Sequence, residues 1–293
     1  MMNVMRAEVY RLLRSRSFYI VVGLLLGFFI VVELMLPMRM AWFGRGGPWD
    51  DWQDVIWTGT VHNAGDWVLA QDLPQGGVAY ALMVSMAFGS MGGFVLLPLL
   101  LVAAGGMFTF GTVKNDMTSG ISRTKLYLCK LMVSSALLTC MMAVLTVIYL
   151  LMGAVWGGYA HAPDGFWQDF VRVVVSQWFV LMALNSVGMF MLFAVRRVAV
   201  AAGVFLAAYI AVPMLLQMLM ERIPAWGWLR FLDLYGLPGA PVVFDDSRLG
   251  AIGGWLGPLV MQTAPLHALA AAAVWLVLST AGGLYLFRRA ELK

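Results

Sequence analysis

Six long apolar runs separated by shorter polar segments dominate the pattern of this chain. They cover residues 18–36, 78–110, 126–156, 171–195, 198–220 and 266–287. Each run meets the length of about 20 apolar residues that a helix needs to cross a bilayer. Their hydrophobicity is continuous rather than alternating, and a backbone in lipid must bond within its own segment, so the pattern favours helices over a barrel. The sequence therefore predicts an all-α membrane protein with six transmembrane helices.

The segments between the runs predict the rest of the organisation. Residues 1–17 form an amphipathic pattern, which predicts an N-terminal helix lying in the inner headgroup layer with its arginines facing anionic lipid. Its apolar arc consists of Met2, Met5, Val9, Leu12 and Leu13, and its arginines are Arg6, Arg11 and Arg14. An ordinary positively charged flank of the first span is the alternative. Residues 18–293 predict a single transmembrane domain with outer loops over 37–77, 157–170 and 221–265.

Composition and charge agree with a membrane protein and predict its orientation. The chain is 62% hydrophobic and 12% charged, against roughly 45–50% and 25% in soluble domains. The predicted spans place 13 of the 19 Lys and Arg residues on the side of the N-terminus. By the positive-inside rule both termini are expected in the cytoplasm, in a multi-pass protein of the plasma membrane. The net charge of +4 then reflects topology, and a nucleic-acid partner is not needed to explain it.

Motifs that would indicate an enzyme are missing from the sequence. The segment from Gly106 to Thr112 approaches a phosphate-binding loop but lacks its lysine. There is no H-E-x-x-H motif, and the histidines His62, His161 and His267 are scattered over predicted outer loops and span ends. We expect neither a catalytic site nor a metal site in this chain.

Polar residues inside the predicted spans are few. Glu33, near the outer end of the first span, is the clearest ionisable residue, and a charge at mid-membrane costs at least about 2.5 kcal/mol. Glu33, Asn185 and Gln217 are candidates for a weakly polar substrate path. The alternatives are that Glu33 reaches outer water and that Asn185, Ser186 and Gln217 form hydrogen bonds between helices.

Small residues and one proline predict local features of the first two spans. Gly23 and Gly27, and likewise Gly89 and Gly93, form small-xxx-small patterns that allow helices to approach closely. Pro98 should kink the second span, because its ring removes one backbone hydrogen bond and clashes with the preceding turn.

The polar segment between the second and third spans carries a family resemblance. Phe110-Gly-Thr-Val-Lys-Asn, Gly120-Ile-Ser-Arg and Leu126-Tyr-Leu-Cys-Lys130 resemble the first cytoplasmic loop of type-2 ATP-binding-cassette (ABC) permeases. The N-terminal helix is similar to the elbow helix of that family, and Tyr285-Leu-Phe-Arg-Arg-Ala-Glu-Leu-Lys293 to its usual terminus. The short outer loop after the first span departs from family members with large extracellular domains. It argues against the lipoprotein-releasing and mechanotransmission types.

The resemblance implies a dimer of six-helix subunits, each resting on a separate ATPase that binds ATP and Mg. This chain itself would hold no cofactor. A coupling helix would contact the ATPase through Lys114, Asn115, Asp116, Met117, Thr118, Ser119, Gly120, Ile121, Ser122 and Arg123. The residue types suit this, because Gly120 can end a short helix in a left-handed cap and Ser122 can N-cap the next helix. An ordinary positive inner loop is the alternative.

The expected function is that of a permease subunit in an ABC exporter. Its substrate would be amphiphilic, such as an antimicrobial peptide, a lipid or a drug, and family analogy adds a role in immunity to such peptides. The expected partners are an ABC ATPase, a second permease subunit in a homodimer or heterodimer, and membrane lipids. The competing hypotheses are an intramembrane lipid-modifying enzyme and a membrane sensor or scaffold that transports nothing.

Overall fold

The computed structural model describes residues 2–43, 95–109, 120–156, 159, 166–211, 215, 219, 222–223 and 265–289. Within these residues every regular element is a helix, and no strand occurs. The predicted all-α class is therefore confirmed for this part of the chain. Most of the three predicted outer loops lies outside it.

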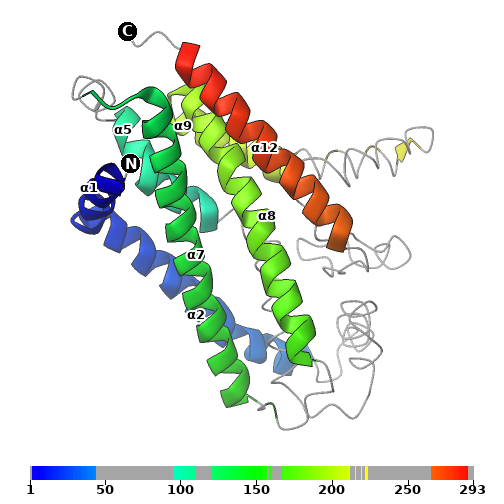
Figure 1. The fold of residues 1–293 in the computed structure, drawn as a ribbon. Coiled ribbons are helices and arrows are strands. Elements are labelled where there is room, and N and C mark those ends of the chain that lie inside the picture. Colours follow the sequence, from blue (N-terminus) through cyan, green and yellow to red (C-terminus); the bar gives the residue numbers. More distant parts are fainter. Residues whose placement is uncertain are drawn as a thin grey trace.

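The helices follow one another in an open bundle (Figure 1). Helix α8 packs along α12, and both contact α7. The elements are α1 (Met2–Leu13), α2 (Arg16–Phe43), a π-helical turn η2 (Leu101–Gly105), α5 (Gly106–Thr109), α7 (Arg123–Trp156), α8 (Phe166–Val195), α9 (Val198–Leu206), a second π-helical turn η3 (Ala207–Ala211) and α12 (Pro265–Arg289).

Several of these helices are long and apolar enough to cross a membrane. Three qualify alone, over Arg123–Val155, Gln177–Val195 and Leu269–Arg289. A fourth span is formed if α1 and the start of α2, which are bent by 69° at their junction, count as one. Two shorter apolar helices cover Val95–Phe108 and Val198–Tyr209. The chain is thus a multi-pass membrane protein, and the count of six stays a prediction because the second and fifth predicted spans are described only in part.

The observed helices are longer than the apolar runs that predict them. Helix α2 continues to Phe43, seven residues beyond its predicted end at position 36 and into the predicted outer loop. Helix α7 begins at Arg123 and α8 at Phe166, before the predicted starts at 126 and 171. Hydropathy marks only the part of a helix that sits in hydrocarbon, whereas backbone hydrogen bonds continue through the polar and interfacial residues that begin α7 and α8. The extension of α2 over residues 37–43 is mostly apolar and continues through Pro37, so this reason does not apply to it.

The second predicted span contains an irregular turn. A π-helical turn covers Leu101–Gly105, three residues after Pro98, and α5 continues from it. Such turns insert one extra residue into a helix and often lie at functional sites. Proline at position 98 cannot donate a backbone hydrogen bond, so the helix is already weakened where this turn begins.

Two buried clusters form the interior of the described bundle. The larger one joins α2, α7, α8, α9 and α12, and it includes Phe29, Leu145, Tyr149, Leu184 and Phe205. The second joins η2, α5, α7, α8, α9 and α12 around Phe193, with Leu100, Met107, Tyr127 and Phe287. This second cluster lies toward the C-terminal end of α12, where basic residues also gather.

Close approach of helices occurs at a glycine that the pattern did not single out. A Cβ built on Gly283 would lie 2.6 Å from Tyr127 Cζ, inside the contact distance of real side chains. By contrast, a Cβ on Gly23 or Gly27 would meet nothing within 4 Å. Within the described chain, the small-xxx-small pattern of α2 therefore makes no close helix contact, and Gly283 allows α12 to pack on α7.

We predict that Gly283→Ala destabilises the protein by about 1–3 kcal/mol, because the new methyl group overpacks the buried Tyr127 ring. Gly203→Ala is the matched control, since Gly203 is an exposed helical glycine whose Cβ would meet nothing within 4 Å. The control should stabilise by about 0.5–1 kcal/mol through helix propensity. The midpoints of thermal unfolding in detergent measure both changes, and equal shifts for the two variants would contradict this packing.

Candidate functional site at the basic end

Most of the basic side chains that the structure describes gather at one end of the molecule. This end, which we call the basic end, holds α1, α5, the start of α7, the turn between α8 and α9, and the C-terminal end of α12 (Figure 1). Its basic residues are Arg6, Arg11, Arg14, Arg16, Arg123, Lys125, Lys130, Arg196, Arg197, Arg288 and Arg289. Gly120 to Arg123, the described part of the predicted coupling segment, lead into the start of α7 at this end.

Helix α1 turns sharply away from the first span. The bend of 69° falls at Arg14 and Ser15, where α1 closes with a hydrogen bond from Arg14 N–H to the Tyr10 carbonyl (3.1 Å). The predicted elbow over residues 1–17 is therefore shorter, since α1 ends at Leu13 and α2 already starts at Arg16.

The roll of α1 about its axis differs from the predicted apolar arc. Glu8 is buried, and Met5 and Leu12 are half-buried beside it, whereas Val9 and Leu13 are exposed. The arc predicted as one lipid-facing surface is thus divided between the protein and its surroundings. The physical reason is the partner of Glu8.

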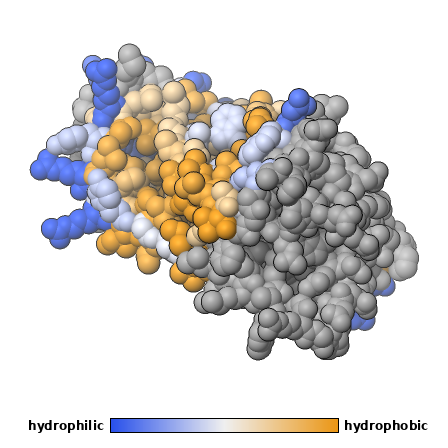
Figure 2. Space-filling model, turned by 90° about the horizontal axis from the view of Figure 1, so that it is seen from below, coloured by the Kyte–Doolittle hydropathy of each residue, from blue (hydrophilic) through white to orange (hydrophobic). Residues whose placement is uncertain are grey.

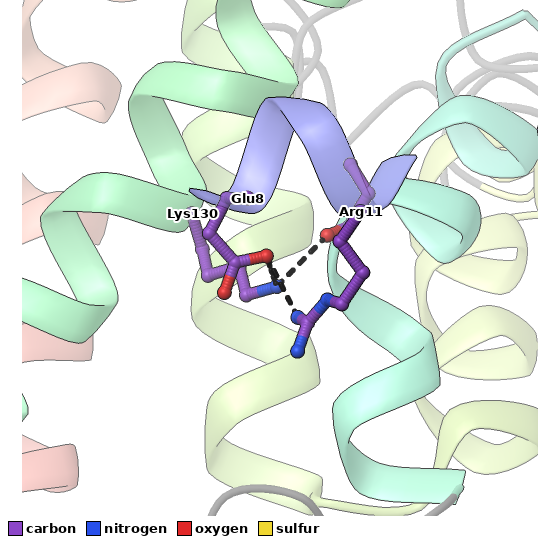
Figure 3. A network of polar contacts seen from close by, with 4 residues as sticks. Glu8, Arg11 and Lys130 are labelled. Carbon is purple, nitrogen blue, oxygen red and sulfur yellow. Dashed lines mark hydrogen bonds and ion pairs between the residues drawn. The ribbon is translucent and has the colours of Figure 1, made fainter. Parts of the chain in front are cut away.

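Glu8 forms a buried ion pair with Lys130 of α7. The Lys130 Nζ lies 2.6 Å from Glu8 Oε2, and the Lys130 side chain is 2% exposed (Figure 3). Arg11, one turn along α1, binds the same carboxylate oxygen at 2.7 Å from the solvent side. One acid thus holds two cations, one buried and one half-exposed.

Lys130 also bonds to the irregular turn of the second span. Its Nζ donates to the Ala103 carbonyl at 3.4 Å, within the π-helical turn (Figure 3). A single ammonium group therefore connects α1, α7 and η2. Lys130 is thus an ionisable residue inside the predicted span 126–156, in addition to Glu33, which the sequence pattern singled out.

The first residue of α7 binds the end of α12. Arg123 Nη1 donates to the carbonyls of Arg288 (2.8 Å) and Phe287 (3.4 Å), and Arg288 Nε donates to Thr124 Oγ1 (3.0 Å). The last carbonyls of a helix lack intrahelical partners and carry partial negative charge, so a guanidinium stabilises them. Arg123 thus fixes the start of α7 to the C-terminal end of α12.

The local structure that leads into α7 agrees with the sequence. Gly120 has a φ of 82°, in the left-handed region that favours glycine. Ser122 Oγ accepts a hydrogen bond from Lys125 N–H at 3.4 Å, which is the contact of an N-cap. The left-handed conformation of Gly120 and the N-cap at Ser122 are confirmed, and the short helix that Gly120 was expected to end lies outside the described residues.

An aromatic cluster holds the helices on either side of segment 110–119. The Phe193 ring of α8 makes edge contacts with Phe108 of α5 (centroids 5.2 Å apart), Tyr127 of α7 (4.8 Å) and Phe287 of α12 (4.8 Å). Phe108 precedes the segment and Tyr127 follows it. Helix α5 before the segment and helix α7 after it therefore both pack on the same ring.

The other predicted site residues divide into two groups. Lys114 to Ser119 and Gln217 lie outside the described residues, and so does the side chain of Glu33. Ile121, which is part of the predicted coupling segment, packs against the Phe193 cluster. Arg6, Arg11 and Arg14 are exposed on α1 as predicted.

Asn185 lies in a polar seam between α7 and α8. Its Nδ2 donates to Ser134 Oγ and Ser135 Oγ at 2.9 Å each, and its Oδ1 has no hydrogen-bond partner within the described part of the chain. Ser186 Oγ lies 2.6 Å from Ser279 Oγ of α12. The interhelical hydrogen bonds expected of Asn185 and Ser186 are confirmed, and a role of Asn185 in a substrate path stays a prediction.

The sequence interpretation missed the pairing of Glu8 with Lys130. A signal for it exists, because Glu8 is the only acid before Glu33 and Lys130 the only charged residue between Leu126 and Trp156. Lys130 lies in an apolar segment and needs an acid to be buried there, and Glu8 is the only acid that the N-terminal helix offers.

Comparison of the chain with protein-family models, with curated proteins and with solved structures finds no match. The resemblance to type-2 ABC permeases therefore rests on the residues of this chain.

We predict that Glu8→Gln destabilises the protein by about 3–5 kcal/mol, because it leaves the Lys130 ammonium buried without its counter-charge. Lys130→Met should relieve most of this loss when combined with Glu8→Gln, since a neutral pair needs no compensation. Unfolding midpoints of the single and double variants in detergent form a double-mutant cycle.

Arg11→Gln is the matched control for this cycle. Arg11 binds the same carboxylate, but its side chain is 47% exposed, so its loss should cost about 1 kcal/mol or less. Additive effects of Glu8→Gln and Lys130→Met would refute the coupling.

Proposed function

We propose that this chain is the permease subunit of an ABC exporter, with six transmembrane helices and an amphipathic elbow helix. It would move an amphiphilic substrate across the plasma membrane, and a separate subunit would bind and hydrolyse the ATP. The observation that carries the proposal is the sequence from Phe110 to Lys130, with its similarity to the first cytoplasmic loop of type-2 ABC permeases.

The surroundings of this segment support a role in transmitting force. Segment 110–119 leaves from α5 and returns through the left-handed Gly120 to the capped start of α7. Helices α5 and α7, which flank the segment, both pack on Phe193, and Arg123 binds the start of α7 to the end of α12. A push on the segment would therefore be delivered to α5, α7, α8 and α12 together.

The charge distribution supports a cytoplasmic location for the basic end. Ends of membrane helices that are rich in Lys and Arg usually face the cytoplasm. In the proposed arrangement the ATPase would dock on this end, a second permease subunit would complete the dimer, and both chain termini would lie inside. The substrate would pass along the weakly polar seam that contains Asn185.

The test uses complexes of this chain with ABC ATPases encoded by neighbouring reading frames. We predict that Gly120→Ala preserves the fold of the permease but lowers its stimulation of ATP hydrolysis about fivefold or more. The reason is that an alanine at a φ of 82° costs roughly 1–2 kcal/mol and shifts the segment from its docked geometry. The control Gly203→Ala, on α9, should leave the stimulation unchanged.

Two results would overturn the proposal. One is that Gly120→Ala leaves both assembly and ATP hydrolysis at the wild-type level. The other is that a membrane-impermeant thiol reagent labels Ser119→Cys from outside intact cells, in a chain whose two native cysteines are replaced by alanine.

A further inference from the structure

The geometry of α1 suits a helix that lies flat at the membrane surface. Helix α2 covers the first apolar run that the sequence predicts to span the membrane, and α1 is bent by 69° from the start of α2. Membrane helices tilt on average by about 20° from the bilayer normal. A helix at 69° to such a span runs close to the membrane plane, at the end where the basic residues gather.

The outward face of α1 combines apolar and cationic residues. Tyr10 is 63% exposed and Leu13 49%, and Arg6 and Arg14 are exposed beside them. Figure 2 shows hydrophilic residues gathered at the edge of the molecule where Figure 1 places α1, next to a broad apolar surface. In water the apolar side chains of this face would stay exposed, whereas a bilayer surface would bury them and contact the arginines through its headgroups.

Arg6, Tyr10 and Arg14 form a row along this face. They stand at positions i, i+4 and i+8, so neighbours in the row are about 6 Å apart at Cβ. The row is ordered by two contacts, since Arg14 Nη1 donates to Tyr10 Oη at 2.8 Å and its guanidinium lies 5.9 Å from the Tyr10 ring centroid. The two arginines and the phenol hydroxyl are suitable partners for phosphate oxygens.

The only acid of α1 lies on the opposite side of the helix from this row, because Glu8 stands two residues before Tyr10 at 3.6 residues per turn. Glu8 is the one acidic residue of α1, and it is turned inward and buried. No carboxylate of α1 therefore neutralises Arg6 or Arg14. The row therefore keeps its positive charge, while Glu8 on the other side of α1 is paired with Lys130.

We propose that the Arg6–Tyr10–Arg14 row binds the headgroups of anionic phospholipids in the leaflet at the basic end. The charge complementarity selects anionic over zwitterionic headgroups, while Val9 and Leu13 insert into the acyl boundary beside them. The elbow helix is then held by two separate attachments, the internal pair Glu8–Lys130 and the external lipid row. This inference requires a membrane protein but does not depend on ATP-driven export.

The test measures amide hydrogen exchange of residues 2–13 in the full chain, in nanodiscs of phosphatidylcholine with and without an equal share of phosphatidylglycerol. Each basic residue near an anionic surface strengthens attachment by about fivefold. For the wild type we expect exchange in phosphatidylglycerol to be slower by about 25-fold for the two arginines together, and the difference to shrink at high salt. Arg6→Gln with Arg14→Gln should abolish the difference between the two lipids.

Two controls separate this site from other causes. Arg289→Gln removes a charge from the same end outside the row and should keep the full difference between lipids. Glu8→Gln should speed exchange even in phosphatidylcholine alone, because it removes the internal attachment, whereas the double arginine variant should leave the rate in phosphatidylcholine unchanged.

The proposal is overturned by any of three results. The first is an equal exchange rate in both lipids for the wild type, and the second is an unchanged lipid difference in the double arginine variant. The third is that inorganic phosphate, added to phosphatidylcholine nanodiscs, protects α1 as well as phosphatidylglycerol does, which would indicate a site for soluble anions.

Discussion

An ammonium group enclosed by membrane helices needs a counter-charge, and this requirement organises the basic end. Lys130 is buried on α7 and does not reach water, so an acid must come to it. The only acid in the first 32 residues is Glu8, which lies on a helix that precedes the first span. Helix α1 must therefore fold back across the start of α2 to deliver it. The bend at Arg14 and Ser15, the roll of α1 and the residues it exposes are all consequences of this one contact.

The cost of burying a charge also determines where charged and neutral polar groups lie along the bundle. Ion pairs and guanidinium contacts occur at the basic end, through Glu8, Lys130 and Arg123. Farther along the bundle the buried polar contacts are uncharged, such as those of Asn185 with Ser134 and of Ser186 with Ser279. The desolvation penalty of an ion grows toward the bilayer centre, whereas neutral hydrogen bonds between helices are cheap at any depth. The uncharged seam therefore joins helices where an ion pair would be costly.

The sequence predicted those features that depend on neighbouring residues. Continuous apolar runs indicated helices, and the spacing of Gly120 and Ser122 indicated a left-handed residue followed by an N-cap, as observed. Contacts between distant segments were not predictable from patterns. Arg123 was expected to face a partner protein, yet it binds carbonyls 164 and 165 residues away, at the end of α12. Glu8 was missed because the apolar arc of α1 was taken to face lipid, whereas the strength of one ion pair decided the roll.

Lys130 and the π-helical turn connect α1 with the helix that precedes residues 110–119. Lys130 holds the Ala103 carbonyl within the turn, and the turn leads through α5 to Phe108 and the segment. Rewinding a π-helical turn into an α-helix shifts the register by one residue, which rotates the next part of the helix by about 100°. Because Glu8 keeps Lys130 in place, a displacement of α1 would loosen the bond between Lys130 and the Ala103 carbonyl in this turn. The contacts from Glu8 through Lys130 to Ala103 therefore join α1 to the helix that leads into residues 110–119.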